Sequence, residues 1–413
     1  ARIFDNNLIT PEGKDVTARL TEEGVLSKVK RKEVETGIVV EGSETEIDNV
    51  RLGYDYAAKM LKRLREEFDL YALKMVDRQG AADATNKFLW ELKDGNLIES
   101  VLIPASKGMY GDWSDRHTLC VSSQVGCAYG CKFCASGLDG IKRNLEADEI
   151  VEQVVAVERW YGQLVKGLNK KQGVDPSELS EDERLVAAMV NRSGGRRNQK
   201  VSKYLVDNIV MMGMGEPLAN YDNLIDALFI LNAEWGCNIG ARKITVSTCG
   251  LAPEIRKLAD EDLQVRLAVS LHAATDDVRE EIMPVNKKYP LEDLIDALEY
   301  YKDRHGQMIT LEYILIEGVN EDVEHIPSLT HLCHILDAKI NLIPYNTVEG
   351  LPWKRPSDEA IDDFHQGLQD NNVNVTLRRE KGHDISAACG QLRLQAEREK
   401  AESSPVEEPA SCD

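Results

Sequence analysis

The sequence contains no apolar run approaching the roughly 18 residues that a membrane-spanning helix needs. Its first residues also lack the layout of a secretory signal peptide. Its nine cysteines are odd in number and unevenly spaced, which does not fit the disulfide framework of a secreted domain. We therefore expect a cytoplasmic protein without membrane partners, and its 413 residues leave room for two domains.

The balance of charge argues against indiscriminate binding of nucleic acids. The net charge is −21, whereas contacts to phosphate groups require cations. Basic clusters nevertheless occur at Lys28–Lys32, Lys59–Arg65 and Arg192–Lys203, although a run of charge is usually a solvated face. The acidic tail 396–413 lacks aromatic residues and is predicted to be disordered. Charge alone does not decide whether RNA is a partner.

Three cysteines lie close together at Cys127, Cys131 and Cys134, with the spacing C-x3-C-x2-C. Thiolates suit zinc or an iron–sulfur cluster, but a closed zinc site and a fully ligated four-iron cluster each need four ligands. The loop offers no fourth cysteine or histidine. Three ligands around a four-iron cube leave one iron open for a substrate. The alternatives are zinc with a remote fourth ligand, or unrelated core cysteines.

Strand-like and helical patterns alternate from residue 117 onward, which predicts βαβ units and a parallel sheet. About six such repeats are too few for a closed eight-fold barrel, so the α/β fold class is predicted to be an open, partial (β/α)6 barrel. Functional groups then collect at the carboxyl ends of the strands. The predicted strands are 117–125, 207–214, 243–249, 264–272, 309–316, 339–345 and 373–378, and the predicted helices are 147–161, 221–235, 252–261, 291–304, 322–336 and 358–370.

The predicted organisation has three parts. Residues 1–86 form an N-terminal accessory region with a helix at 49–67, and residues 87–395 form the core, interrupted by an exposed, partly mobile insertion at 162–204. The tail 396–413 follows. The core opens with a β-hairpin at 87–104, because Asp94-Gly95 separates two alternating apolar runs. Glu99 lies on its second strand, where an exposed strand carboxylate is the simplest interpretation.

Small or polar residues end several predicted strands, and together they predict a polar small-molecule site. Each alone is more often a turn or a satisfied polar group. They are Gly215, Glu216, Ser247, Ser270, Leu271, His272 and Asn346. Cys120 lies on the first strand of the core, and Cys389 follows the last predicted strand. A free cysteine is usually a small buried residue, which is the interpretation given to Cys237, Cys249, Cys333 and Cys412 and the simplest one for Cys389.

Several motifs, in order, resemble the RlmN/Cfr family of radical S-adenosylmethionine (SAM) RNA methyltransferases. The resemblance covers about 87–393, is closer to the branch that methylates carbon 2 of adenine, and fades over residues 1–70, where the family has a small helical RNA-contacting domain. The insertion 162–204 is longer than the family pattern. The motifs are Leu119–Cys127, the cysteine loop, Arg143–Leu145, Met211–Pro217, Val269–His272, Pro284–Lys288 and Ala387–Gln391.

The resemblance implies an activity and a role for each residue. Cys127, Cys131 and Cys134 would hold a [4Fe–4S] cluster, and two SAM molecules would be used per turnover. Cys389 would take a methyl group from one SAM, a radical derived from the second would activate that methyl group, Glu99 would accept the proton from adenine, and Cys120 would release the product by forming a disulfide. SAM would be held by the seven strand-end residues named above.

The implied substrate is an adenine of 23S rRNA in the peptidyl-transferase centre, and in some members also a transfer-RNA adenine. An external electron donor such as flavodoxin is implied as a partner. Two alternatives stay open at this stage. One is methylation of carbon 8 of the same adenine, and the other is a zinc-stabilised RNA-binding protein without catalysis.

Overall fold

The computed structural model describes residues 72–80, 85–105, 116–170, 178–180, 183–184, 186, 204–306, 308–348, 350–378 and 393. The chain divides after Ala72 into two compact units, and the second begins at Leu73. The predicted helix 49–67, the tail 396–413, Cys389 and most of the insertion lie outside the described residues. Within those residues, no helix has both the length and the apolar character required to cross a membrane.

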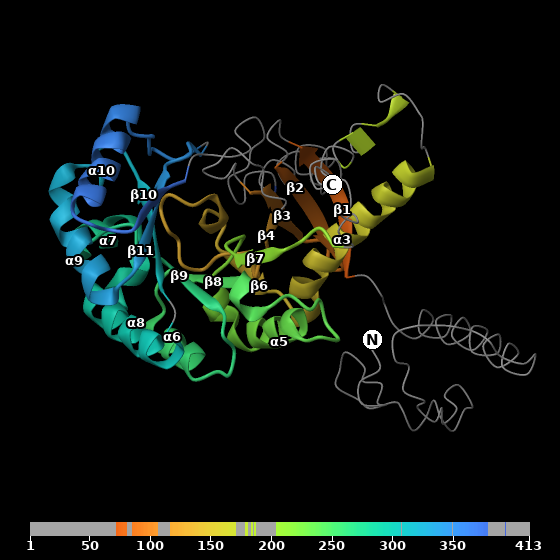
Figure 1. Ribbon diagram of the computed structural model, residues 1–413, viewed down its shortest axis with the longest axis horizontal. Helices are drawn as coiled ribbons and strands as arrows, with labels where there is room; N and C mark the ends of the chain where they lie inside the picture. The colour runs from red at the N-terminus through yellow and green to blue at the C-terminus, as the bar shows by residue number, and fades with distance from the viewer. Residues whose placement is uncertain are drawn as a thin grey trace, which may run out of the picture. The chain divides into compact units, whose positions relative to one another are not determined.

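One large sheet organises the second unit (Figure 1). Its ten strands follow the order β1-β2-β3-β4-β7-β8-β9-β10-β11-β12, antiparallel as far as β4 and parallel from β4 to β12. The strands are β1 (Leu73–Gly80), β2 (Asn86–Leu92), β3 (Leu97–Pro104), β4 (His117–Cys120), β7 (Asn208–Met211), β8 (Ile244–Thr248), β9 (Arg266–Ser270), β10 (Thr310–Leu315), β11 (Lys339–Pro344) and β12 (Val375–Leu377).

Helices lie between successive parallel strands along the chain, so these strands are joined by crossover connections. In Figure 1 the later helices lie along the outer side of the sheet, while the loop between β4 and α3 lies on its inner side. The helices are α3 (Ala147–Lys170), α5 (Tyr221–Asn232), α6 (Ala252–Ala259), α7 (Asp276–Ile282), α8 (Leu291–His305), α9 (Ile326–Leu336) and α10 (Asp358–Asp370). The predicted partial barrel is therefore confirmed, with β1 and β12 at the edges of an open sheet.

Short elements complete the described chain. A second, two-stranded sheet pairs β5 (Gln124–Gly126) with β6 (Ile141–Asn144) on either side of the cysteine loop. Single turns of 3-10 helix occur at η1 (Ala135–Gly137), η3 (Pro217–Asn220), η4 (Ala241–Lys243), η5 (Pro284–Lys287) and η6 (Val323–His325). Of these turns, η3 and η6 lie at strand-to-helix junctions, η4 lies between a helix and a strand, η5 lies between two helices, and η1 lies between the two strands of the small sheet.

Burial follows the expected periodicities. Helix α5 buries Leu224, Ala227, Leu228 and Leu231, which recur at the spacing of one helical face. Each large aliphatic side chain buried in this way contributes roughly 1.5–3 kcal/mol relative to exposure. The predicted hairpin is also confirmed, because β2 and β3 pair in antiparallel register across the turn at Gly95, whose φ is +80°.

The structure differs from the sequence prediction at the ends of two segments. Strand β1 precedes the predicted core boundary at residue 87, yet it pairs with β2 in the main sheet. Helix α3 continues to Lys170 instead of ending at 161, so it extends into the predicted insertion. Val186 within that insertion is fully buried, and Glu158 of α3 accepts backbone N–H bonds from Leu205 and Val206 just beyond it. Within the predicted insertion, the described residues therefore include a helical stretch as far as Lys170 and one buried side chain, Val186.

Candidate active site

The register of the sheet places the predicted functional side chains on one face. Residues directly opposite on neighbouring strands share a face, as do residues two apart along one strand. The pairs Val101 with Cys120, Cys120 with Val210, Val210 with Thr245, Ser247 with Ala268, and Ser270 with Glu312 connect this face from β3 to β10. The shared face thus carries Glu99, Cys120, Ser247, Ser270 and Glu312. The first four were singled out in the sequence, and Glu312 was not.

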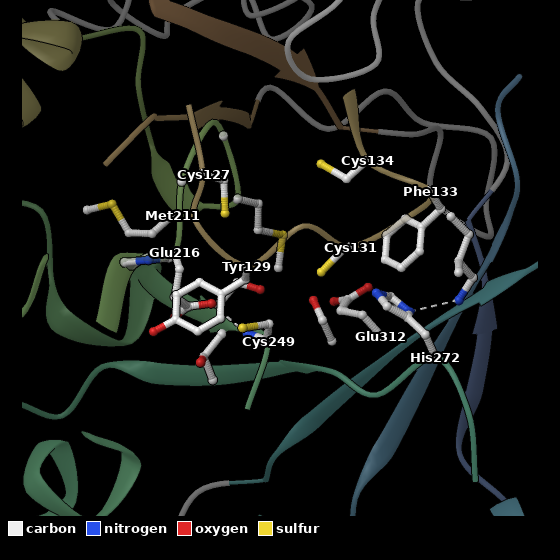
Figure 2. A pocket seen from close by; sticks show the side chains of 18 of the residues that line it. Cys127, Tyr129, Cys131, Phe133, Cys134, Met211, Glu216, Cys249, His272 and Glu312 are labelled. Atoms are coloured by element: carbon white, nitrogen blue, oxygen red, sulfur yellow. Dashed lines mark hydrogen bonds between the residues drawn. The ribbon is translucent and has the colours of Figure 1, made fainter. Parts of the chain in front are cut away.

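A cavity of about 270 Å³ opens on this face beneath the cysteine loop (Figure 2). Cys127, Cys131 and Cys134 all line it, together with the aromatic rings of Tyr129 and Phe133. The strand-end residues that line it are Gly215, Glu216, Ser247, Ser270 and His272. Leu271 is buried and Asn346 is half-buried, but neither belongs to the lining. The structure therefore brings the three cysteines and five of the seven predicted SAM-binding positions to one cavity.

Backbone bonds hold the cysteine loop over the cavity. The N–H of Cys127 donates to the carbonyl of Gly140 at 3.1 Å, and the N–H of Cys134 donates to the carbonyl of Cys131 at 3.0 Å. The N–H of Lys132 donates to Ile282 at 2.9 Å, and the indole of Trp353 donates to the carbonyl of Lys132 at 2.8 Å. The loop is thus tied to elements distant in sequence, which fixes the backbone that carries the three thiols.

The three thiols fit a cluster better than a single ion. Burial raises the pKa of Cys127 to about 12, and burial followed by repulsion from the other thiols raises the pKa of Cys131. Such thiols lose their protons only when a metal centre compensates the charge. A closed zinc site needs four ligands, whereas a four-iron cluster held by these three thiolates would keep one iron open.

Glu216 is held by the protein through its carboxylate. One oxygen accepts the N–H of Cys249 at 2.7 Å, and the other accepts the N–H of Leu218 at 3.1 Å, which caps η3. The Glu216 N–H donates to the side chain of Gln124 at 2.9 Å. Burial raises the pKa of this carboxyl group, and the bonds from the end of β8 oppose that shift. Glu216 therefore joins the ends of β7 and β8 at the cavity wall.

His272 is fixed in an unusual backbone conformation at the end of β9. Its φ is +59°, a region that costs free energy for a residue with a side chain. Its Nδ1 accepts the N–H of Ile314 at 3.1 Å, and its carbonyl accepts the amide of the buried Asn320 at 2.7 Å. Because Nδ1 accepts, we assign the ring proton to Nε2. The imidazole meets the ring of Phe133 edge to face, with 4.8 Å between ring centres.

The structure also reveals a buried arginine that sequence reasoning missed. Arg279 is completely buried, and its guanidinium donates to the carbonyls of Cys249 at 2.7 Å and Leu271 at 3.1 Å. It also donates to the side chain of Asn286 at 2.7 Å. The arginine thus fastens the ends of β8 and β9 together behind the cavity. Its position between the motifs Val269–His272 and Pro284–Lys288 was the available signal.

Glu312 is the second residue that the sequence analysis missed. It is 4% exposed and lines the cavity, and its Oε1 accepts the amide of Asn341 at 2.9 Å. Its Oε2 has no hydrogen-bond partner in the described part of the chain. Burial raises the pKa of Glu312, while the charge of Arg378 opposes that shift. An open, buried acceptor is costly, so its place beside the cavity indicates a donor on a ligand. In Figure 2 its carboxylate lies between Cys131 and His272.

From the sequence, the simplest interpretation of Glu99 is an exposed carboxylate on a strand, and this interpretation is wrong. It is 3% exposed and forms an ion pair of 2.9 Å with the fully buried Lys87. Its Oε1 also accepts the backbone N–H of Arg393 at 2.6 Å. Cys120 is buried on the same face, near Glu99. Cys389 lies outside the described residues, and Arg393 follows it by four positions in the sequence.

Comparison with known proteins agrees with this geometry. Residues 198–329 match the model of the Radical SAM superfamily, which in general uses SAM and a [4Fe–4S] cluster. The chain is 51% identical over 337 residues to a probable dual-specificity RNA methyltransferase RlmN 3 of Opitutus terrae, covering 82% of both proteins. The chain belongs to the RlmN family. It is also 49% identical to a probable RlmN of Akkermansia muciniphila, covering 82% of this chain and 83% of that protein.

A solved structure supports the fold of this RlmN-family chain. A radical SAM methyltransferase from Sphaerobacter thermophilus superposes with a TM-score of 0.65 at 40% identity, covering 80% of this chain and 84% of that one. The RlmN-family chain is thus a radical SAM methyltransferase.

Proposed function

We propose that this protein methylates carbon 2 of an adenine in 23S rRNA, and the matching adenine-containing site in transfer RNA, within the cytoplasm. The observation that carries the proposal is that three cysteines and five strand-end residues line one cavity, on the sheet face that also carries Glu99 and Cys120. The relatives from Opitutus terrae and Akkermansia muciniphila are described as dual-specificity RNA methyltransferases, which supports the proposal of two RNA substrates.

The chemistry of the target explains why radical chemistry is needed. Carbon 2 of adenine is an unactivated sp2 carbon, so polar methyl transfer from SAM to it fails and a cofactor must supply radical chemistry. A [4Fe–4S] cluster on Cys127, Cys131 and Cys134 would supply the electron that cleaves SAM, replenished by an external donor such as flavodoxin. SAM would be held by the cavity-lining residues Gly215, Glu216, Ser247, Ser270 and His272. Leu271 and Asn346, which lie at strand ends but outside the lining, would complete the set.

Three residues divide the transfer itself. The thiolate of Cys389 forms a bond to the methyl carbon of one SAM, whose sulfonium bond breaks and releases S-adenosylhomocysteine. After the activated methylene group adds to the base, Glu99 removes the ring proton, and the adduct gives up one electron, for which the cluster would be the acceptor. The thiolate of Cys120 then attacks the sulfur of Cys389. The bond between that sulfur and the methylene carbon breaks, the carbon takes up a proton to become the methyl group of the product, and a disulfide remains that must be reduced.

Chain connectivity supports the participation of Cys389. Four peptide units separate it from Arg393, which limits the two Cα atoms to about 14 Å apart. The N–H of Arg393 lies 2.6 Å from the carboxylate of Glu99, and Glu99 shares a sheet face with Cys120. The target adenine must leave its stack to reach these groups, as bases do for enzymes that modify them.

The test is product analysis of RNA from a strain that lacks the protein and then regains it. Digested RNA should contain 2-methyladenosine only when the protein is present, and 8-methyladenosine at that site would establish the alternative regiochemistry instead. Cys389→Ala should abolish methylation, and Cys120→Ala should accumulate a denaturant-resistant protein–RNA adduct. Cys333→Ala, at a buried cysteine of α9 away from the cavity, is the matched control.

Two results would refute the proposal. Full methylation by Cys389→Ala would exclude the covalent route. A protein purified without oxygen that holds one zinc and no iron would support the non-catalytic RNA-binding alternative.

A further inference from the structure

Arg393 makes two contacts that join parts of the protein distant in sequence. Its backbone N–H donates to Oε1 of Glu99 at 2.6 Å, across 294 positions. Its guanidinium pairs with Asp139 at 3.1 Å, across 254 positions, and the arginine side chain is completely buried. An arginine is almost never fully buried unless it is paired. The burial therefore indicates a specific binding position for this residue, formed by Glu99 and Asp139 and called its seat below.

The seat is a small group of compensating charges. Lys87 lies 2.9 Å from Glu99, and both side chains are buried, with 0% and 3% exposed. The group therefore contains two cations, Lys87 and Arg393, and two anions, Glu99 and Asp139. A buried charge without its partner is strongly unfavourable. Each member of the group thus favours the presence of the others, and loss of Arg393 leaves Asp139 without this buried partner.

Asp139 connects this seat to the cysteine loop. It immediately precedes Gly140, whose carbonyl accepts the N–H of Cys127 at 3.1 Å. The N–H of Gly140 in turn donates to Gly137, which ends η1 directly after Cys134. Asp139 therefore lies in the turn that closes the cysteine loop. Arg393 therefore contacts both this turn and the hairpin that carries Glu99.

We propose that Arg393 is a positioning residue that docks the C-terminal segment carrying Cys389 onto Glu99 and the cysteine loop. The inference rests on the proposed role of Cys389. Radical transfer demands that the methyl group, its activating radical and the base be aligned, and small displacements of reacting groups cost large factors in rate. Arg393 sets this alignment because it lies only four positions from the methyl carrier.

Loss of the docking contact should uncouple SAM cleavage from RNA methylation. In Arg393→Met, the molar ratio of 5′-deoxyadenosine formed to adenine methylated should rise at least tenfold, while iron content and the binding of SAM stay at the wild-type level. Arg393→Lys keeps the charge and should recover part of the coupling. A residue needed only for folding would lower both products together and would not change their ratio.

A milder variant guards against simple unfolding. Asp139→Asn removes the charge of the partner, whose side chain is 44% exposed, and it should raise the same ratio. Asp337→Asn is the matched control, since Asp337 pairs with Lys302 at 3.4 Å on the surface and is 78% exposed. Asp337→Asn should leave the ratio unchanged.

Hydrogen–deuterium exchange tests docking without any turnover. On the cluster-loaded protein, peptides covering 385–395 should exchange at least tenfold faster in Arg393→Met and Asp139→Asn than in the wild type and in Asp337→Asn. Wild-type exchange and a wild-type coupling ratio in Asp139→Asn would overturn the inference. If the wild type methylated no RNA, the proposed function would fail, while the exchange result would still decide whether Arg393 docks the segment.

Discussion

His272 provides the sharpest physical test of the cavity, because its charge state is set by burial. Burial, followed by the nearby charge of Arg279, lowers the pKa of His272 from 6.5 to about 3. The imidazole is therefore neutral in the folded protein and is protonated in the unfolded chain below pH 6.5. The unfolded state then binds the additional proton. His272 therefore does not reduce the free energy of unfolding above pH 6.5, and that free energy declines as the pH falls towards 3.

The size of this loss follows from the shift. Each pKa unit corresponds to about 1.4 kcal/mol, so at pH 5 the neutral His272 lowers the free energy of unfolding by about 2 kcal/mol relative to pH 7. Asn is the suitable replacement, because it tolerates the positive φ of this position and does not titrate. The burial-raised pKa values of Glu216 and Glu312 affect the wild type and the variant alike, so they cancel in the comparison.

Urea unfolding of the wild type and of His272→Asn, followed by circular dichroism at several pH values between 7 and 4.5, measures the effect. The wild type should lose about 2 kcal/mol more than the variant between pH 7 and pH 5, corresponding to one additional proton taken up on unfolding. Equal pH dependence of the two proteins would show that His272 is charged or exposed. The assigned Nε2 tautomer and the closed cavity wall would then both be wrong.

Three further changes test other parts of the site. Glu312→Gln keeps an acceptor for Asn341 but replaces the open Oε2 by a donor, so the affinity for SAM, measured by equilibrium dialysis, should fall by about tenfold, as expected for a lost bond to a charged acceptor. Arg279→Met leaves two buried carbonyls and an amide without their donor, and the free energy of unfolding should drop by about 3 kcal/mol or more. In Gly213→Ala the new Cβ would lie 2.6 Å from the carbonyl oxygen of Val121, and a thermal melt should show a loss of about 1–3 kcal/mol.

Regular elements with clear periodicity could be predicted from the sequence. Helix α10 begins and ends at the predicted residues, because Ser357 caps its first turn and apolar side chains recur on one face. Strand β1 was missed because most of its side chains are exposed or half-buried, so no alternation marks it. The short α7 was missed for lack of repeated turns, and β5 and β6 contain only three and four residues.

The position of the candidate site could be predicted from the sequence, but the hydrogen bonds and ion pairs between its residues could not. Strand-end polarity located the cavity, since the carboxyl ends of parallel strands meet at one edge. It could not show that the carboxylate of Glu216 bonds to the backbone of Cys249, because that bond depends on how two loops approach each other. The pair of Lys87 with Glu99 was available in principle: the hairpin register pairs Lys87 with Val101, two residues from Glu99 on the same face.

Buried charge explains why these missed residues gather where they do. A core built only for stability avoids Lys, Arg and Glu, because removing them from water costs several kcal/mol each. Lys87, Glu99, Arg279, Glu312 and Arg393 are nonetheless all at most 4% exposed. Arg279 and Glu312 lie at or near the cavity, and the other three lie where Arg393 contacts Glu99 of the hairpin. Such groups reorient little once paired, so they fix a geometry that apolar packing alone would leave free to adjust. The free energy lost by burying these charged side chains is concentrated where the proposed reaction requires its reacting groups to be aligned. The ion pairs and hydrogen bonds found there are the strongest physical argument for placing the active site on this face of the sheet.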